Sequence, residues 1–385
     1  MKILQFGRFH DQNHGGIERH VAILAAGLKA YGTVDNVVAN NRWQTEVEAA
    51  APVRTYKIRS LGTLAGVAVA PTFPLFVKRL WERERYDIAH LHFPDPLSHF
   101  AAELLPREVK RVVTWHSDIV RQRRLFALYR PLLDGFLERV DAVIAATPKH
   151  FEMSRQLDAI RGSPKCRVIA YGIDLAPFAA SDELMRRAAK LRASLSSPKS
   201  VVFAVGRHVY YKGFEYLIRA MSGLDAVLVL GGSGPLLDTH RRLAAAAGVA
   251  HKVIFPGRIE ERDLAAYYHA ADVFCLPSCE PSEAFGIVQL EAMACAKPIV
   301  NCELGNGVNF VAPHDVCALS VPPRDPTALA RALNGLLQDT GRRNALGGAG
   351  LDRVNRMFSA RRMVDEHLAL YRELLDAHSQ GMSEP

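Results

Sequence analysis

The chain has 385 residues, more than one hydrophobic core usually organises, so about two domains of ordinary size are expected. Its net charge is +8, and residues 1–175, with 25 basic and 18 acidic side chains, supply +7 of it, which suits anionic lipid, phosphate or nucleic acid. The charged and apolar fractions are those of a soluble globular enzyme, and the longest uncharged run, 60–77, is too short and too proline-broken for a membrane span.

Short β-like runs alternate with helical periodicity along the whole chain, which predicts parallel sheets with crossover helices. Residues 1–16 contain only a strand-length apolar run and no signal peptide. The expected strands are 2–7, 34–40, 87–93, 110–116, 141–147, 166–172, 200–206, 225–231, 251–257, 272–278 and 297–302. The predicted fold class is therefore α/β, with two doubly wound, Rossmann-like domains whose ligands bind beyond the carboxyl ends of the strands.

The domain boundaries follow from composition. We assign 1–175 to an N-terminal domain, the polar 176–199 to a linker region, 200–358 to a C-terminal domain, 359–378 to a final helix and 379–385 to a tail. Five of the six cysteines fall between Cys275 and Cys317 at spacings that fit no common zinc pattern, so reduced, buried thiols in a cytoplasmic protein are expected.

Two strand-to-helix loops are candidates for phosphate binding. Gly15 and Gly16 open a helix after the first strand, where a backbone can approach a phosphate, although a plain glycine turn explains them equally well. Arg207 and Lys212 follow the first strand of the second domain and can converge on one diphosphate. The alternative for that pair is a solvated basic loop. Neither the loop at Gly15 and Gly16 nor the run "GGSGP" at Gly231 fits the GxGxxG dinucleotide fingerprint.

The segment 272–302 is predicted as strand, loop, helix and strand, with the helix beginning near Phe285 and ending about Cys295. Glu283 precedes this helix, whose first amides provide anion-binding donors. Glu291 lies inside it among apolar residues, where an unpaired charge is costly. A capping glutamate plus a surface glutamate is the alternative interpretation.

A GR…KG loop followed by two glutamates eight residues apart, with Phe-Gly after the first, resembles the retaining GT-B glycosyltransferases of family 4. The stretches "WHSDIVRQRRLFALYRPLLDGFLERVDAVIAATP", "SEAFGIVQLEAMACAKP" and "CELGNG" are similar to a bacterial branch that includes O-antigen and exopolysaccharide mannosyltransferases. The resemblance implies two domains facing across a cleft, with the C-terminal helix returning to the first domain.

The resemblance also implies roles for single residues. Arg207 and Lys212 hold the donor diphosphate, Glu283 the sugar hydroxyls and Glu291 the ribose. His116 lies beside the donor sugar; a core histidine bonded to backbone is the alternative. Further donor contacts are implied for Gly15, Gly16, Arg258, Ile259, Phe285, Gly286 and Ile287. Ala296 stands where many relatives have a glycine of positive φ.

The implied reaction transfers a hexosyl group with retention from a nucleotide diphosphate sugar, GDP-mannose first and UDP-sugars second, to a glycan or lipid-linked acceptor. No metal or other cofactor is expected, because cationic side chains and helix amides stabilise the leaving diphosphate. The remaining alternatives are a nucleotide-sugar 2-epimerase, a dehydrogenase, which the missing fingerprint disfavours, and a non-catalytic sugar-nucleotide binding subunit.

The acceptor is expected at the basic first domain, through Asp118, Arg121, Arg123 and Arg124. These arginines and the run 78–86 suggest a peripheral position on the cytoplasmic face of the inner membrane, with anionic headgroups as partners and no nucleic acid. A solvated basic face is the alternative for each run.

Overall fold

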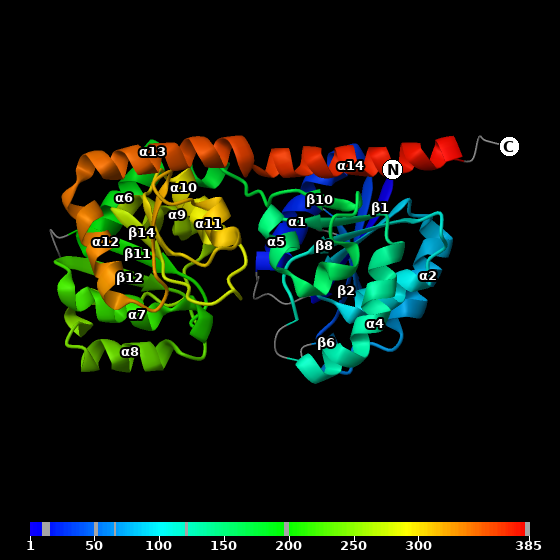
Figure 1. The fold of residues 1–385 in the computed structure, drawn as a ribbon, viewed down its shortest axis with the longest axis horizontal. Helices are drawn as coiled ribbons and strands as arrows, with labels where there is room; N and C mark the ends of the chain where they lie inside the picture. The colour runs from blue at the N-terminus through cyan, green and yellow to red at the C-terminus, as the bar shows by residue number, and fades with distance from the viewer. Residues whose placement is uncertain (10–15, 50–52, 65–66, 120–121, 196–199, 382–385) are drawn as a thin grey trace. The chain divides into compact units, whose positions relative to one another are not determined.

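The computed structural model describes residues 1–9, 16–49, 53–64, 67–119, 122–195 and 200–381 (Figure 1). The chain divides into two compact units, residues 1–172 with 360–385, and residues 173–359. Each unit is built around a largely parallel sheet, so the predicted α/β fold class is confirmed.

The first unit contains an eight-stranded sheet in the order β10-β9-β8-β7-β1-β2-β4-β3. All neighbouring strands pair parallel except β3 with β4 at the edge. The strands are β1 (Lys2–Phe9), β2 (Thr33–Ala39), β3 (Glu46–Glu48), β4 (Arg54–Ile58), β7 (Ile88–Phe93), β8 (Lys110–Trp115), β9 (Ala142–Ala145) and β10 (Cys166–Val168), and β5 (Thr63–Leu64) pairs separately with β6 (Val67–Ala68). The order changes direction between β1 and β7.

Helices cover both faces of this sheet (Figure 1). The helices are α1 (Gly16–Leu28), α2 (Phe73–Glu84), α3 (Pro96–Glu103), α4 (Arg123–Arg139), α5 (Pro148–Met153) and α14 (Ala360–Gly381). Apolar residues of α2, α3 and α4 pack on one face, and those of α1 and α14 on the other. The last two pack so closely that a Cβ at Gly27 would lie 2.3 Å from Cγ2 of Val364.

The final helix is longer than predicted, because α14 continues to Gly381 and includes the first residues assigned to a tail. It belongs to the first unit, as the resemblance implied. Among the described residues, none of the helices has both the length and the apolar character that crossing a membrane requires.

The second unit contains a six-stranded parallel sheet in the order β13-β12-β11-β14-β15-β16. Its strands are β11 (Ser200–Val205), β12 (Ala226–Gly231), β13 (Val253–Ile254), β14 (Val273–Leu276), β15 (Ile299–Cys302) and β16 (Ala318–Val321). Its helices are α6 (Asp182–Ser194), α7 (Phe214–Ala220), α8 (Leu237–Ala246), α9 (Glu261–Ala270), α10 (Ile287–Ala294), α11 (Gly307–Val311), α12 (Pro326–Gln338) and α13 (Thr340–Met357). The strand order changes direction between β11 and β14.

The segment 176–199 differs from the predicted linker. Its described residues belong to the second unit, and α6 packs against α9. Arg187 pairs with Asp263 at 2.5 Å, and Arg192 pairs with Asp272 at 2.8 Å. The polar composition that suggested a linker is therefore the outer face of a docked amphipathic helix.

Candidate functional site

The loops after β11 and β14 meet at the point where the strand order of the second unit reverses, which is where doubly wound sheets bind ligands. Backbone contacts hold the two loops together. The amide of Cys279 donates to the carbonyl of Tyr211 at 2.9 Å. Gly213 has φ +64°, and a Cβ there would lie 2.1 Å from the carbonyl oxygen of Pro277. Only glycine allows this approach.

This approach joins Lys212 and Glu283 in an ion pair, with Nζ 2.5 Å from Oε2. Both residues are buried, at 8% and 9% exposure. The hydroxyl of Ser278 donates to the same carboxylate oxygen at 2.9 Å. Two predicted site residues from different loops thus form one buried, charged group at the end of the sheet.

Arg207 lies in the same loop as Lys212, but its side chain is exposed. No described residue forms a hydrogen bond or ion pair with its guanidinium. Burial raises the pKa of Tyr211, the charges of Lys212 and Arg207 oppose this rise, and the charge of Glu283 adds to it. Both predicted cations and Glu283 therefore act on one tyrosine of this loop.

The helix after Glu283 begins later than predicted. Helix α10 starts at Ile287, so Phe285 and Gly286 precede it. Gly286 has φ +73°, and a Cβ there would lie 2.8 Å from Cδ2 of Leu276, which accounts for a glycine at this position. Phe285 is buried, and its ring centroid lies 6.1 Å from that of Phe358. Of the three residues predicted as amide donors, Ile287 alone is helical.

Glu291 is 1% exposed on α10. The hydroxyl of Tyr268 donates to its Oε2 at 2.7 Å. The buried charge expected at this position is thus hydrogen-bonded. The ribose role implied for Glu291 stays a prediction.

The loop after β13 carries Arg258 and Ile259, two of the residues implied to contact the sugar donor. Arg258 is exposed. Ile259 packs over the end of β12, where a Cβ at Gly231 would lie 2.5 Å from its Cδ1 and 3.3 Å from Cγ2 of Val205. The structure therefore brings Ile259 to the carboxyl ends of β11 and β12.

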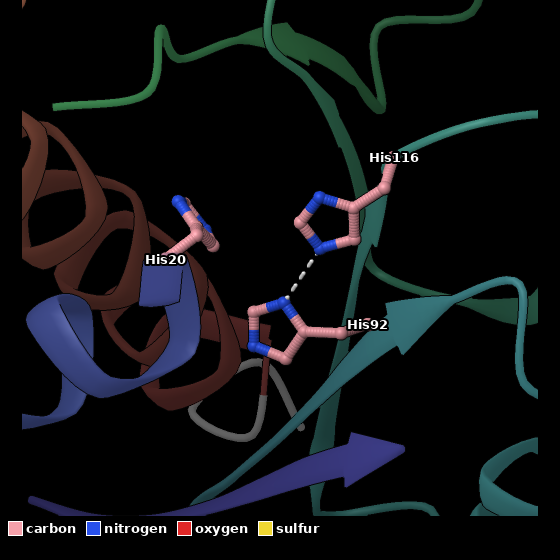
Figure 2. A group of neighbouring side chains, drawn as sticks. All are labelled: His20, His92 and His116. Atoms are coloured by element: carbon pink, nitrogen blue, oxygen red, sulfur yellow. Dashed lines mark hydrogen bonds between the residues drawn. The ribbon is translucent and has the colours of Figure 1, made fainter. Parts of the chain in front are cut away.

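In the first unit, His116 follows β8 and is 5% exposed. One ring nitrogen, Nε2, lies 3.0 Å from Nδ1 of His92, and the other, Nδ1, lies 2.6 Å from the hydroxyl of Tyr171. His20 on α1 faces the same space (Figure 2). Sequence reasoning missed His20 and His92. His90 and His92 alternate in "HLHF", so both side chains point to one face of β7. This alternation is the sequence signal that could have identified His92.

Two of the predicted acceptor residues have described side chains, Asp118 in the loop after β8 and Arg124 at the start of α4. Asp118 accepts hydrogen bonds from Nε1 of Trp115 at 3.0 Å and from the hydroxyl of Ser154 at 2.6 Å, so its carboxylate has internal partners. Arg124 is exposed in the first turn of α4.

Four other predicted positions, Gly15, Gly16, Arg121 and Arg123, yield less. Gly16 is the first residue of α1. Gly15 and Arg121 lie outside the described residues, and Arg123 is described only as the first backbone position of α4.

All six cysteines are free. Burial raises the pKa of five of them in the second unit, Cys279 and Cys317 included, so their thiols are protonated at neutral pH. The prediction of reduced thiols agrees with these positions.

Two protein-family models match the chain. The model described as Glycosyltransferase Family 4 matches residues 14–177, and the model described as Glycosyl transferases group 1 matches residues 187–353. Each model thus covers most of one compact unit.

Known proteins resemble the chain over most of its length. O-antigen chain mannosyltransferase C of Escherichia coli is 30% identical over 383 residues, covering 98% of this chain and 100% of that protein. D-rhamnosyltransferase WbpZ of Pseudomonas aeruginosa is 37% identical over 276 residues, covering 71% and 70%. The structure of sucrose-phosphate synthase from Thermosynechococcus elongatus matches with a TM-score of 0.81 at 27% identity, covering 98% and 99%. The chain therefore belongs to the family 4 glycosyltransferases, also described as glycosyl transferases group 1, and has their GT-B fold.

Proposed function

We propose that this glycosyltransferase moves a mannosyl group from GDP-mannose to a glycan or lipid-linked acceptor in cell-surface polysaccharide synthesis. The names of the two relatives, an O-antigen chain mannosyltransferase and a D-rhamnosyltransferase, support a hexosyl donor and a surface glycan. A UDP-sugar donor is the competing assignment, and a donor screen separates the two.

The Lys212–Glu283 ion pair is the observation that carries the proposal. It joins a diphosphate-binding group and a hydroxyl-binding group at the position where this fold binds ligands. When a donor binds, a phosphate oxygen replaces Glu283 as the partner of Lys212, and a sugar hydroxyl donates to the released carboxylate. Arg207, with its exposed guanidinium, supplies the second positive charge for the diphosphate.

The chemistry follows from these charges. As the bond between sugar and diphosphate breaks, negative charge grows on the leaving group, and Lys212, Arg207 and the start of α10 stabilise it. Glu283 is assigned to a sugar hydroxyl, so we propose no covalent glycosyl-enzyme on that carboxylate. A same-face substitution then gives retention, with the departing diphosphate accepting the acceptor's proton.

The donor is tested first by a thermal-shift screen of GDP-mannose, GDP, UDP-glucose, UDP-N-acetylglucosamine and UDP. A ligand at 100 times its dissociation constant adds about 2.7 kcal/mol to stability. Stabilisation by GDP and GDP-mannose alone supports the proposal. Stabilisation by the uridine ligands alone would contradict GDP-mannose as the donor and assign a UDP-sugar instead.

The site is tested by turnover of Glu283→Gln against Glu280→Gln as a matched control. Both changes remove a carboxylate charge from one loop, but Glu280 pairs with Arg324 outside the proposed site. We expect about 100-fold loss of turnover for the first variant and near-normal turnover for the second. Equal activities would remove Glu283 from the site. The anomeric configuration of the product, followed by NMR, tests retention.

We further propose that transfer requires no metal ion, because the residues that stabilise the leaving group are cationic. Turnover in excess chelator measures this directly. Complete loss of turnover that magnesium restores would contradict this account of leaving-group stabilisation.

A peripheral contact with anionic lipid is proposed for α4. Leu125, Leu128 and Leu132 are 58%, 79% and 54% exposed at helical spacing, and Arg124 is exposed in the same helix. Flotation with anionic liposomes at low salt tests this contact. We expect Leu128→Ser to weaken binding more than Leu75→Ser, which alters an equally apolar but separate exposed site on α2. Absence of binding by the native protein would refute the contact.

A further inference from the structure

Five histidines are buried on one face of the first unit's sheet. His90 and His92 alternate on β7, His116 follows β8, His20 comes from α1, and His367 comes from α14. All five are at most 5% exposed. The strand order brings them together, because β7 and β8 are neighbours and α1 and α14 cover this face.

Three of these histidines present nitrogen atoms to a common space. One ring nitrogen each of His20, His92 and His116 lies within 4.8 Å of the other two (Figure 2). Nδ1 of His92 and Nε2 of His116 are 3.0 Å apart. Two ligands of a tetrahedral zinc ion are separated by about 3.3 Å, given Zn–N bonds of about 2.0 Å. This pair is thus already close to the spacing of two ligands.

The hydrogen bonding of the third ring is unusual. Among the residues that the structure describes, neither ring nitrogen of His20 has a hydrogen-bond partner, although His20 is 2% exposed, and Nε2 of His92 has none either. Buried polar atoms nearly always have partners, because leaving one unpaired costs about 1–3 kcal/mol. A ligand that accepts nitrogen lone pairs would account for a ring aimed at two others.

We propose that His20, His92 and His116 bind one divalent transition-metal ion of the zinc type, each through one ring nitrogen. Three histidines with a fourth position left to water or a substrate oxygen are an established zinc ligand set. Imidazole also suits cobalt, nickel and copper, so the proposal concerns this class of ion. Burial lowers the pKa of His20 and lowers that of His92 to about 3, which keeps both rings in the neutral form that metals need.

The proton balance of binding is simple. A neutral imidazole carries one ring hydrogen, and the contact between His92 and His116 uses one of them. Binding breaks that hydrogen bond and moves the hydrogen of one ring to its other nitrogen, so no proton is released overall. For His116, the other nitrogen then donates to the hydroxyl oxygen of Tyr171, which lies 2.6 Å away and fixes the ring orientation.

The consequence for activity rests on the role implied for His116 beside the donor sugar. An ion held by this ring withdraws its nitrogen from the substrate, so the metal inhibits transfer. Metal binding itself does not depend on that role. The two proposals can therefore be refuted separately. Metal binding without inhibition of transfer would contradict the role of His116 beside the donor sugar, and an absence of metal binding would contradict the metal site.

The test titrates metal-free, full-length protein with Co²⁺ while recording its visible spectrum. We expect one equivalent to bind with the intense bands of a tetrahedral or five-coordinate nitrogen site, and Zn²⁺ to displace it. His20→Gln and His92→Gln should each lower the affinity at least 10-fold. The matched control is His240→Gln, because His240 is buried and contacts one other histidine, His208, at 2.8 Å between their Nδ1 atoms.

A second measurement covers variants that fail to fold. X-ray absorption of the Zn²⁺-loaded native protein should show about three imidazole ligands and no sulfur. No binding, a thiolate-to-cobalt charge-transfer band, or equal affinity in His20→Gln and native protein would each overturn the proposal. Inhibition of transfer by Zn²⁺ should disappear in His20→Gln.

Discussion

Ala296 has φ +52°, a left-handed conformation that side chains other than glycine adopt at a cost of about 1–2 kcal/mol. It follows Cys295, the C-cap residue of α10, and its amide donates to the carbonyl of Met293 at 2.9 Å, so it stands where a helix-ending glycine normally does. Its side chain is exposed, so removing the methyl group loses no core packing. Ala296→Gly should therefore relieve backbone strain and stabilise the second unit.

The size of this gain is the strain relieved minus the extra freedom of glycine in the unfolded chain. The first is about 1–2 kcal/mol and the second about 0.4–1 kcal/mol, so the midpoints of the two ranges leave a net gain of about 0.8 kcal/mol. For a unit of this size, that corresponds to a rise of roughly 1–4 °C in the unfolding temperature.

Differential scanning calorimetry measures the effect, with Ala189→Gly as the control. Ala189 is exposed inside α6 of the same unit, where glycine costs about 0.5–1 kcal/mol, so the two identical substitutions should shift the transition in opposite directions. A lower unfolding temperature for both variants would refute the argument from strain.

Three other predictions follow from packing, charge and hydrogen bonding. Gly27→Ala should destabilise the first unit by about 1–3 kcal/mol, because the new Cβ would meet Val364. Adding Val364→Ala to this variant should restore most of the lost stability, as measured by thermal unfolding. Burial lowers the pKa of His99 to about 4. In the unfolded chain, His99 binds a proton near pH 6.5, so the free energy of unfolding falls as pH drops from 6.5 towards 4, by up to about 1.4 kcal/mol per pH unit. His99→Phe should reduce the pH dependence of the free energy of urea unfolding by that amount. Tyr268→Phe should cost about 1–3 kcal/mol by removing a donor from the buried carboxylate of Glu291, whereas an unchanged unfolding midpoint would mean that other partners suffice.

The sheets were predictable where strands are long, apolar and followed by glycine or a polar loop. The central strands of both units agree with the sequence pattern because their near-continuous Val, Ile and Leu runs are buried on both faces. The edge strands β3 and β16 were missed, since each is short and one is polar. Helix α6 was taken for a linker because its apolar stripe is narrow, with Leu184 and Ala188 its buried residues.

The candidate site was predictable as residue types in loops, but not as contacts. Arg207, Lys212 and Glu283 were expected on loops that end at one sheet edge, and the strand order brings those loops together. That Lys212 and Glu283 pair with each other depends on the backbone approach at Gly213, which no spacing reveals. His20, His92 and His116 are far apart in sequence, so their cluster depends on strand order and on the angle of α1.

Because α14 packs on the first unit, that unit is formed from two segments of the chain that the second unit separates in sequence. Met363, Val364, Leu368 and Tyr371 complete the apolar cluster on one face of a sheet whose strands all lie before residue 169. During synthesis, that face stays uncovered until α14 leaves the ribosome, after the whole second unit has been made. A chimera joined only at residue 173 would therefore pair a sheet with the closing helix of a different protein, and exchange of the first unit requires exchange of both chain ends.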